Sequence, residues 1–261
     1  MSEKRAFALN CQSIRHWKEL RPILAVTAYD YPMARHLDEA GVDILHVGDS
    51  LGMVMLGHDN TTQVTMEDIL RATEAVAKAR KQALITADLP YRSYENPEQA
   101  LINARRLVAA GADAVKMEGG RELEPQILAL RSAGIEMQGH LGMLPQHVVE
   151  EGGYRKKGRR ADEVEALSQD ALFLETMGMF SIVLEAVVAE VAGAITRNLS
   201  IPTIGIASGL STTGQIQVCS DLLGMTPWWS FPHVKPQAQL GREIQEAFVR
   251  YRQSMSNNIK P

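Results

Sequence analysis

Four short apolar segments, each ending on or just before an acidic residue, constrain the fold of this chain more than any other feature. The segments are VDILHVGDS with Asp49, ALITADLP with Asp88, AVKMEGG with Glu118 and SIVLEA with Glu185. Strands of a parallel sheet are buried on both faces and are therefore apolar almost throughout. The carboxyl ends of such strands meet at one edge, where α/β enzymes place their chemistry. The sequence therefore predicts that the four carboxylates converge at that edge.

Helical segments alternate with the strands. Asn96-Pro97 and the capping-box spacing from Thr65 to Asp68 mark two helix starts. Left-handed helix C-caps are expected at four glycines: Gly41, Gly111, Gly134 and Gly178. Strands are expected at 23–28, 42–47, 83–87, 112–117, 135–139, 180–185, 202–206 and 216–219. This alternation implies right-handed βαβ units, and seven or eight of them favour closure into a (β/α)8 TIM barrel.

The chain of 261 residues suits one barrel domain covering residues 1–261, with a short N-terminal extension. Helices are expected at 97–110, 162–177 and about 236–254, with a flexible polar tail over 256–261. Two long connections, 50–64 and 141–160, follow the second and fifth strands and are candidate lids.

Composition excludes several classes of protein. A hydrophobic fraction of 45% is sufficient for a full core, and a net charge of −4 disfavours nucleic-acid binding. No apolar stretch is long enough to span a membrane, and no secretory leader is recognisable. The two cysteines do not suggest a disulfide framework, so a cytoplasmic location is expected.

Asp49, Asp88 and Glu118 are candidate ligands of a divalent metal ion. Three carboxylates at successive strand ends repel one another unless a cation or a shared proton relieves them. Hard oxygen ligands suit Mg²⁺, which polarises a chelating 2-oxo acid and acidifies the C–H beside its ketone. The alternative is that each carboxylate separately caps a helix or pairs with an arginine.

Lys116 lies two residues before Glu118, so that both side chains lie on one face of the strand. It is a candidate for binding a carboxylate or stabilising an enolate, or else it forms a structural ion pair. Glu185 is a candidate general base, with a helix N-cap or an interface ion pair as the alternative. His140, in GHLG, either contacts a substrate oxygen, orients a carboxylate or serves only the structure.

Other polar motifs are less specific. His46 is interpreted as a core residue and His58 as a structural residue of the 50–64 connection. The basic run 154–160 either closes over an acidic ligand or is a solvated loop. The chain has no phosphate-binding P-loop, no dinucleotide-binding glycine motif, no C-x-x-C and no H-E-x-x-H, so nucleotide and zinc sites are not supported.

The chain resembles the ketopantoate hydroxymethyltransferase family, within the superfamily of phosphoenolpyruvate mutase and isocitrate lyase. The resemblance is strongest between residues 27 and 185. Its motifs are TAYD from Thr27, VGDSLGM from Val47, GHD from Gly57, ADLP from Ala87, VKMEGG from Val115, GHLG from Gly139, PQ from Pro145, GGY from Gly152 and VLE from Val183. So many motifs in one order are much more specific than any one of them.

The resemblance implies a (β/α)8 barrel, a bound Mg²⁺ and a homodecamer. It implies transfer of a hydroxymethyl group from 5,10-methylenetetrahydrofolate to 3-methyl-2-oxobutanoate, giving 2-dehydropantoate through a metal-stabilised enolate. Asp49, Asp88 and Glu118 match the family's metal residues. The residues that match its 2-oxo-acid site are Asp49, Ser50, Asp88 and Lys116, and Glu185 matches its proton acceptor. Ser50 rests on the resemblance alone.

Departures from the family pattern fall in the last third of the chain. GIASG from Gly205 replaces the usual GIGAG, so that Ala207 and Ser208 stand for Gly and Ala. Thr213 replaces an Asp, Ser220 replaces a His, and residues 231–234 replace a P-K-F-type segment. We expect the changes at Thr213 and Ser220 to alter hydrogen bonding near the barrel mouth. The groups for metal and 2-oxo acid are retained, whereas the folate side or the alkyl pocket is altered.

Two other functions are compatible with these residues. One is a Mg²⁺-dependent 2-oxo-acid aldolase or lyase that needs no folate. The other is a paralogue that has lost catalysis and serves as a scaffold, although all four acids and Lys116 are retained.

Overall fold

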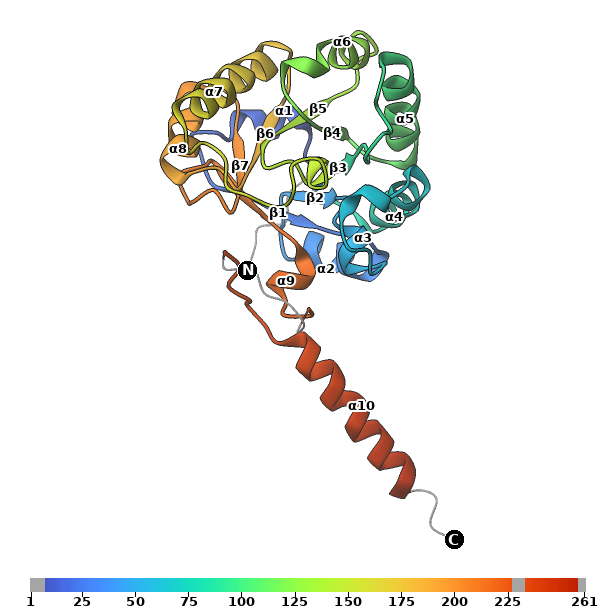
Figure 1. Cartoon of the computed structure of the whole chain (residues 1–261). Helices are drawn as coiled ribbons and strands as arrows, with labels where there is room; N and C mark the ends of the chain where they lie inside the picture. The colour runs from blue at the N-terminus through green and yellow to red at the C-terminus, as the bar shows by residue number, and fades with distance from the viewer. Residues whose placement is uncertain (1–7, 227–232, 258–261) are drawn as a thin grey trace. The chain divides into compact units, whose positions relative to one another are not determined.

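The computed structural model describes residues 8–226 and 233–257, and it contains a closed barrel of parallel strands in the order β1 to β8 (Figure 1). The strands are β1 Ile23–Thr27, β2 Ile44–Val47, β3 Leu84–Asp88, β4 Ala114–Glu118, β5 Met137–Gly142, β6 Ser181–Glu185, β7 Thr203–Ile206 and β8 Gly214–Gln217. The predicted (β/α)8 fold is confirmed. Most predicted strand boundaries are within two or three residues of the observed ones.

The α-helices are α1 Cys11–His16, α2 Tyr31–Glu39, α3 Leu51–Val54, α4 Met66–Ala79, α5 Pro97–Ala110, α6 Glu124–Ser132, α7 Ala161–Thr176, α8 Ala189–Asn198, α9 Cys219–Leu222 and α10 Leu240–Asn257. Short 3-10 helices are η1 Thr61–Gln63, η2 Arg121–Leu123 and η3 Pro145–His147. Figure 1 shows the longer helices of the first 200 residues ringing the strands. The predicted helix 97–110 matches α5, 162–177 is offset by one residue from α7, and the last predicted helix begins four residues before α10.

The capping signals act as the sequence predicted. The Asn96 side chain accepts the Gln99 N–H, and Thr65 and Asp68 form a reciprocal capping box. The four glycines have the positive φ that L-residues adopt at a cost: 85° at Gly41, 110° at Gly111, 70° at Gly134 and 96° at Gly178.

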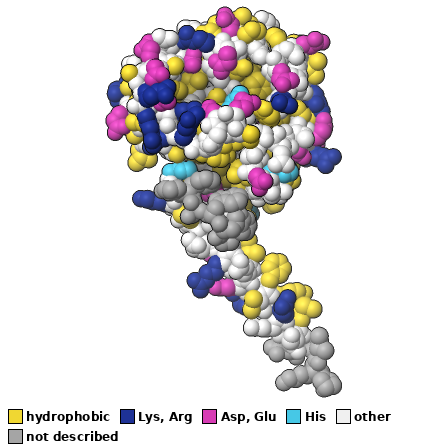
Figure 2. All heavy atoms as spheres, in the orientation of Figure 1, with side chains coloured by type: hydrophobic (Ala, Val, Ile, Leu, Met, Phe, Trp, Pro, Cys, Tyr) yellow, Lys and Arg dark blue, Asp and Glu magenta, His cyan; other side chains and the backbone are white. Residues whose placement is uncertain are grey.

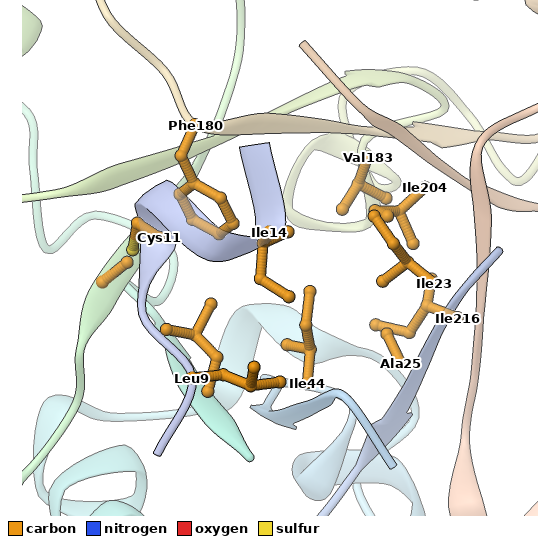
Figure 3. Packing of buried hydrophobic residues seen from close by; sticks show 12 residues of the cluster. Leu9, Cys11, Ile14, Ile23, Ala25, Ile44, Phe180, Val183, Ile204 and Ile216 are labelled. Carbon is orange, nitrogen blue, oxygen red and sulfur yellow. The ribbon is translucent and has the colours of Figure 1, made fainter. Parts of the chain in front are cut away.

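Helix α1 packs beneath the barrel against an apolar layer at the amino ends of the strands (Figure 3). Ile14 of α1 is fully buried there, near Ile44 and Phe180. The other buried members of this cluster are Leu9, Cys11, Ile23, Ala25, Leu84, Ala114, Val183, Ile204 and Ile216. This end of the barrel is thus filled by hydrocarbon, which leaves the opposite end for polar groups.

The two-residue period of the strands places polar side chains above that layer. In β4, Ala114 belongs to the apolar layer, so Lys116 and Glu118 follow it up the same face. The strand register pairs Lys116 with Gln138 and Glu118 with His140. The inward face of β4 therefore changes from apolar Ala114 at the base to charged Lys116 and Glu118 toward its carboxyl end.

Contacts divide the chain into two compact units, residues 1–216 and 217–261. The expectation of a single domain with a short N-terminal extension and a flexible tail stays a prediction, and residues 1–7 and 258–261 lie outside the described residues. Among the residues that the structure describes, no helix combines the length and apolarity needed to cross a membrane.

Candidate active site

The three carboxylates predicted to bind metal converge where β2, β3 and β4 end. Asp88 and Glu118 are the last residues of β3 and β4, and Asp49 follows β2 by two residues. All three are at least 96% buried. The Asp49 N–H donates to Asp88 Oδ2 at 2.9 Å. Burial, with Asp88 and Glu118 nearby, raises the pKa of Asp49 well above its usual value.

Lys116 supplies the positive charge that balances this group. Its Nζ lies 2.8 Å from Asp88 Oδ1 and 3.8 Å from Glu118 Oε1. Burial alone would lower the pKa of Lys116, but Asp88 and Glu118 more than offset it, so its pKa is raised. Burial alone would raise the pKa of Asp88, which Lys116 and His46 instead hold below its ordinary value. The pair is therefore ionised.

His140 links the acid trio to Glu185. Its Nδ1 lies 3.2 Å from Glu118 Oε1, and its Nε2 lies 3.4 Å from Glu185 Oε2. Burial and Lys116 lower the pKa of His140, but Glu118 and Glu185 outweigh them and raise it to about 9. His140 thus bridges the Glu118 and Glu185 carboxylates, and its Nδ1 also lies 3.2 Å from Lys116 Nζ. Of the roles left open for His140, the geometry favours orienting carboxylates.

His46, which the sequence suggested as a core residue, is buried but faces the acid trio. Its Nδ1 lies 2.8 Å from Thr86 Oγ1, and its Nε2 lies 3.4 Å from Asp88 Oδ1. The Thr86 contact fixes the ring, so that His46 presents one nitrogen to Asp88.

Ser50 lies next to Asp49 at the start of α3, but its side chain does not cap that helix. Its Oγ lies 2.9 Å from the hydroxyl of Tyr29, which follows β1. The Ser50 hydroxyl is therefore held at the carboxyl ends of the strands beside the carboxylates.

Glu185 is partly buried at the end of β6, on a turn with unusual backbone geometry. The next residue, Ala186, has a φ of 48°, and Ala207 on the adjoining turn has a φ of 53°. Ser208 joins the two turns, because its hydroxyl donates to the Leu184 carbonyl at 2.7 Å and accepts the Val187 N–H at 2.9 Å. The departures at 207 and 208 therefore lie against the segment that carries Glu185.

The expectation for Thr213 is wrong. Thr213 directly precedes β8, and its Oγ1 accepts the N–H of Thr203, the first residue of β7, at 3.3 Å. It therefore lies at the amino ends of the strands, opposite the carboxylates. Ser220 is in α9, in the second compact unit, where its carbonyl accepts the Met225 N–H. Of the segment 231–234, residues 231 and 232 lie outside the described residues.

The basic run 154–160 lies along the segment after Glu185. The Lys157 N–H donates to the Ala186 carbonyl at 2.8 Å, and the Lys157 carbonyl accepts the Val188 N–H. Its charges pair with acids, Lys157 with Glu151 and Arg160 with Asp162. Acidic and basic side chains are likewise interspersed over the barrel face in Figure 2. The run is therefore fixed against the segment after Glu185, and both of its expected roles stay predictions.

Sequence reasoning missed Gln146, Tyr94, His46 and Tyr29 as members of the site. Gln146 lies in η3 within the 141–160 connection, and Tyr94 lies in the connection after β3. Gln146 is hydrogen-bonded to Asp49 and Glu118, and Tyr94 is hydrogen-bonded to Gln146. The motif PQ at 145–146 was the one signal that could have indicated Gln146.

The carboxylates provide oxygen atoms suited to a hard cation. Asp88 Oδ1 and Glu118 Oε1 are buried and accept no hydrogen bond of normal geometry, although both lie near Lys116. Such anionic oxygens are the ligands that Mg²⁺ prefers. Within residues 8–226 and 233–257, however, no three His, Cys, Asp or Glu side chains are already arranged around one point as a metal site. The carboxylate oxygens are thus of the type that binds Mg²⁺. Lys116 Nζ lies near two of them, Asp88 Oδ1 and Glu118 Oε1.

Comparison with known proteins gives the family. The family model described as ketopantoate hydroxymethyltransferase matches residues 8–261. A 3-methyl-2-oxobutanoate hydroxymethyltransferase of Ignicoccus hospitalis is 46% identical, over 95% of this chain and 94% of that protein. One from Pyrobaculum neutrophilum is 48% identical over 90% of both chains.

Solved structures share the fold at much lower identity. A phosphoenolpyruvate phosphomutase from Streptomyces platensis subsp. rosaceus is similar with a TM-score of 0.63 and 14% identity, over 96% of this chain and 88% of that one. This likeness shows that the two proteins share a fold. The chain is an enzyme that belongs to the ketopantoate hydroxymethyltransferase family.

Proposed function

We propose that this enzyme transfers a hydroxymethyl group from 5,10-methylenetetrahydrofolate to C3 of 3-methyl-2-oxobutanoate, forming 2-dehydropantoate and tetrahydrofolate. Full-length similarity to enzymes named for this transfer supports the acceptor. The observation that carries the chemistry is the ionised Lys116, buried within 4 Å of Asp88 and Glu118 at the carboxyl ends of the strands. A 2-oxo acid becomes an enolate when it loses its C3 proton, and a fixed cation stabilises that charge.

Asp49, Asp88 and Glu118 would hold Mg²⁺, which supplies Lewis acidity toward the carboxylate and ketone oxygens of the substrate. Lys116 provides a positive charge that persists through turnover, because its raised pKa keeps it protonated at neutral pH. Ser50, whose hydroxyl is held by Tyr29, offers a hydrogen bond to the 2-oxo acid.

Glu185 is the proposed proton acceptor. It lies on the far side of His140 from the acid trio and is less buried than those carboxylates. His140 restrains it by a contact of 3.4 Å, and Ser208 fixes the backbone around it. When C3 loses its proton to Glu185, that carbon forms a bond to the one-carbon unit of the donor. Both carbon–nitrogen bonds between that unit and the folate break, and water supplies the oxygen of the new hydroxyl group. The C3 proton and one proton of the water are taken up by the two folate nitrogens, which gives tetrahydrofolate.

The test is a product assay with donor labelled with ¹³C at the methylene carbon. Purified enzyme, Mg²⁺ and 3-methyl-2-oxobutanoate are incubated with and without the labelled folate, and 2-dehydropantoate is measured by mass spectrometry. Labelled product that appears only with folate and disappears with a chelator supports the proposal. Cleavage or formation of other 2-oxo acids without folate would identify the aldolase or lyase instead, and no turnover of any 2-oxo acid would favour the scaffold.

We further propose that the enzyme works in the cytoplasm as a homo-oligomer, and that the oligomer is the decamer its family resemblance implies. The sequence has two cysteines, Cys11 and Cys219, and both are buried, which suits a reducing compartment. Light scattering coupled to size-exclusion chromatography would give a mass near ten times 28.7 kDa. A monomer mass would contradict the oligomer.

A further inference from the structure

Gln146 connects two of the three carboxylates through two different donors. Its side-chain amide Nε2 donates to Asp49 Oδ2 at 2.8 Å, and its backbone N–H donates to Glu118 Oε2 at 3.0 Å. One residue of the 141–160 connection therefore contacts acids carried by β2 and by β4. Gln146 is 98% buried, so water does not compete for these bonds.

The amide of Gln146 is itself fixed in one orientation. Nε2 also donates to the Leu89 carbonyl at 3.0 Å, and the Tyr94 hydroxyl donates to Oε1 at 2.7 Å. A flipped amide would direct its oxygen at two acceptors, Asp49 Oδ2 and the Leu89 carbonyl, and would leave the Tyr94 hydroxyl facing a donor. Only the observed orientation of the Gln146 amide therefore satisfies its contacts with Asp49, Leu89 and Tyr94.

These hydrogen bonds make the two oxygen atoms of each carboxylate different from one another. An N–H group occupies one oxygen of each acid: Oδ2 of Asp49, Oδ2 of Asp88 and Oε2 of Glu118. The opposite oxygens of Asp88 and Glu118 accept no hydrogen bond of normal geometry and lie near Lys116. The amide groups therefore decide which oxygens remain for a cation or substrate.

We propose that Gln146, held by Tyr94, is a positioning residue that orients the Asp49 carboxylate and sets which of its oxygens is available to a cation or substrate. This inference rests on the proposed function, because it concerns the residues proposed there to hold Mg²⁺. Outer hydrogen-bond partners of metal-binding side chains typically change metal affinity about 10- to 100-fold when removed. Gln146 has the same relation to Asp49.

The test compares Gln146→Met with two other variants. Methionine has a similar size and no donor, so it removes the bonds to Asp49 and Leu89 but keeps the backbone N–H bond to Glu118. Tyr94→Phe removes the hydroxyl that fixes Oε1 and that also lies 3.4 Å from the Glu118 backbone N–H and carbonyl. Gln126→Met is the matched control, because Gln126 is a buried glutamine that donates to the Tyr94 and Glu95 carbonyls and touches no carboxylate of the site.

Two readouts are used, neither of which needs turnover. Mn²⁺ binding to each protein is measured by electron paramagnetic resonance without substrate, and a crystal structure of Gln146→Met shows the Asp49 rotamer. We expect affinity to fall at least about 10-fold in Gln146→Met, less in Tyr94→Phe, and not at all in Gln126→Met. The double variant of Gln146 and Tyr94 should bind nearly as tightly as Gln146→Met alone, because the shortest contact of the Tyr94 hydroxyl is to the same amide, at 2.7 Å, and its contacts with the Glu118 backbone are longer, at 3.4 Å.

The outcomes separate this inference from the proposed function. Unchanged affinity in Gln146→Met, or an equal loss in Gln126→Met, would overturn the positioning role while leaving the transferase proposal intact. If the unaltered enzyme binds no Mn²⁺ or Mg²⁺, the metal part of the proposed function fails, and the crystal structure still decides the inference. An Asp49 carboxylate that stays in place without the Gln146 amide overturns it.

Discussion

Replacing Ser208 by alanine should loosen the turn that carries Glu185. The Ser208 hydroxyl is buried and bonds both the Leu184 carbonyl and the Val187 N–H. Alanine leaves the Val187 N–H without this acceptor, and an unsatisfied buried donor costs about 1–3 kcal/mol. Ala207→Gly should instead stabilise the protein. Ala207 has a φ of 53°, a left-handed conformation that is unfavourable for alanine but not for glycine. Relief of left-handed strain is worth roughly 1–2 kcal/mol, from which glycine's extra freedom in the unfolded chain subtracts about 0.4–1 kcal/mol.

Urea unfolding followed by circular dichroism measures both changes. The free energy of unfolding should fall by about 1–3 kcal/mol in Ser208→Ala and rise by up to about 1.6 kcal/mol in Ala207→Gly. Exchange of the C3 proton of 3-methyl-2-oxobutanoate with D₂O should slow in Ser208→Ala alone, because only that change frees the segment around Glu185. A Ser208→Ala protein with unaltered stability and exchange would refute the reasoning.

Three further predictions concern other parts of the barrel. Glu185→Gln should keep 2-oxo-acid binding in calorimetry but lose most turnover; equal turnover would remove Glu185 from the mechanism. The His140 pKa of about 9 lies above its unfolded value of about 6.5, so its contribution to stability is full below pH 6.5 and is lost as pH rises through 9. Urea unfolding at several pH values should therefore show a steeper decline for the unaltered enzyme than for His140→Asn. Ile14→Ala should lower the free energy of unfolding by about 2–5 kcal/mol, because Ile14 is fully buried beneath the barrel; a loss below 1 kcal/mol would mean that α1 is not part of the core.

The barrel and its acids were predictable because strand periodicity is local. Once Ala114 packs at the base, Lys116 and Glu118 must follow on the same face, and parallel pairing brings them beside Asp88 and His140. The first inference depends on residues at most four positions apart in one strand, and the second depends on the regular register of neighbouring parallel strands. The roles of the site residues stay predictions, but their proximity follows from this geometry.

Loops and irregular units were less predictable. Gln146 enters the site from a connection of about twenty residues, and no periodic pattern decides where such a loop returns. Thr213 was misplaced because the unit between β7 and β8 has no helix. Residues 207–213 therefore return directly to the amino ends of the strands. The eighth strand was predicted two residues late, at 216–219, whereas β8 ends at Gln217 and Cys219 begins α9.

A proton NMR time course in D₂O tests the central claim most directly. The sample contains enzyme, Mg²⁺, 3-methyl-2-oxobutanoate and 5,10-methylenetetrahydrofolate, and a parallel sample contains a chelator. We predict loss of the C3 proton signal and growth of 2-dehydropantoate signals, both abolished by the chelator. Loss of the C3 signal without product would mean that the site forms the enolate but transfers no one-carbon unit from folate. A C3 signal that persists under all conditions would contradict the proposed chemistry of Lys116 and Glu185.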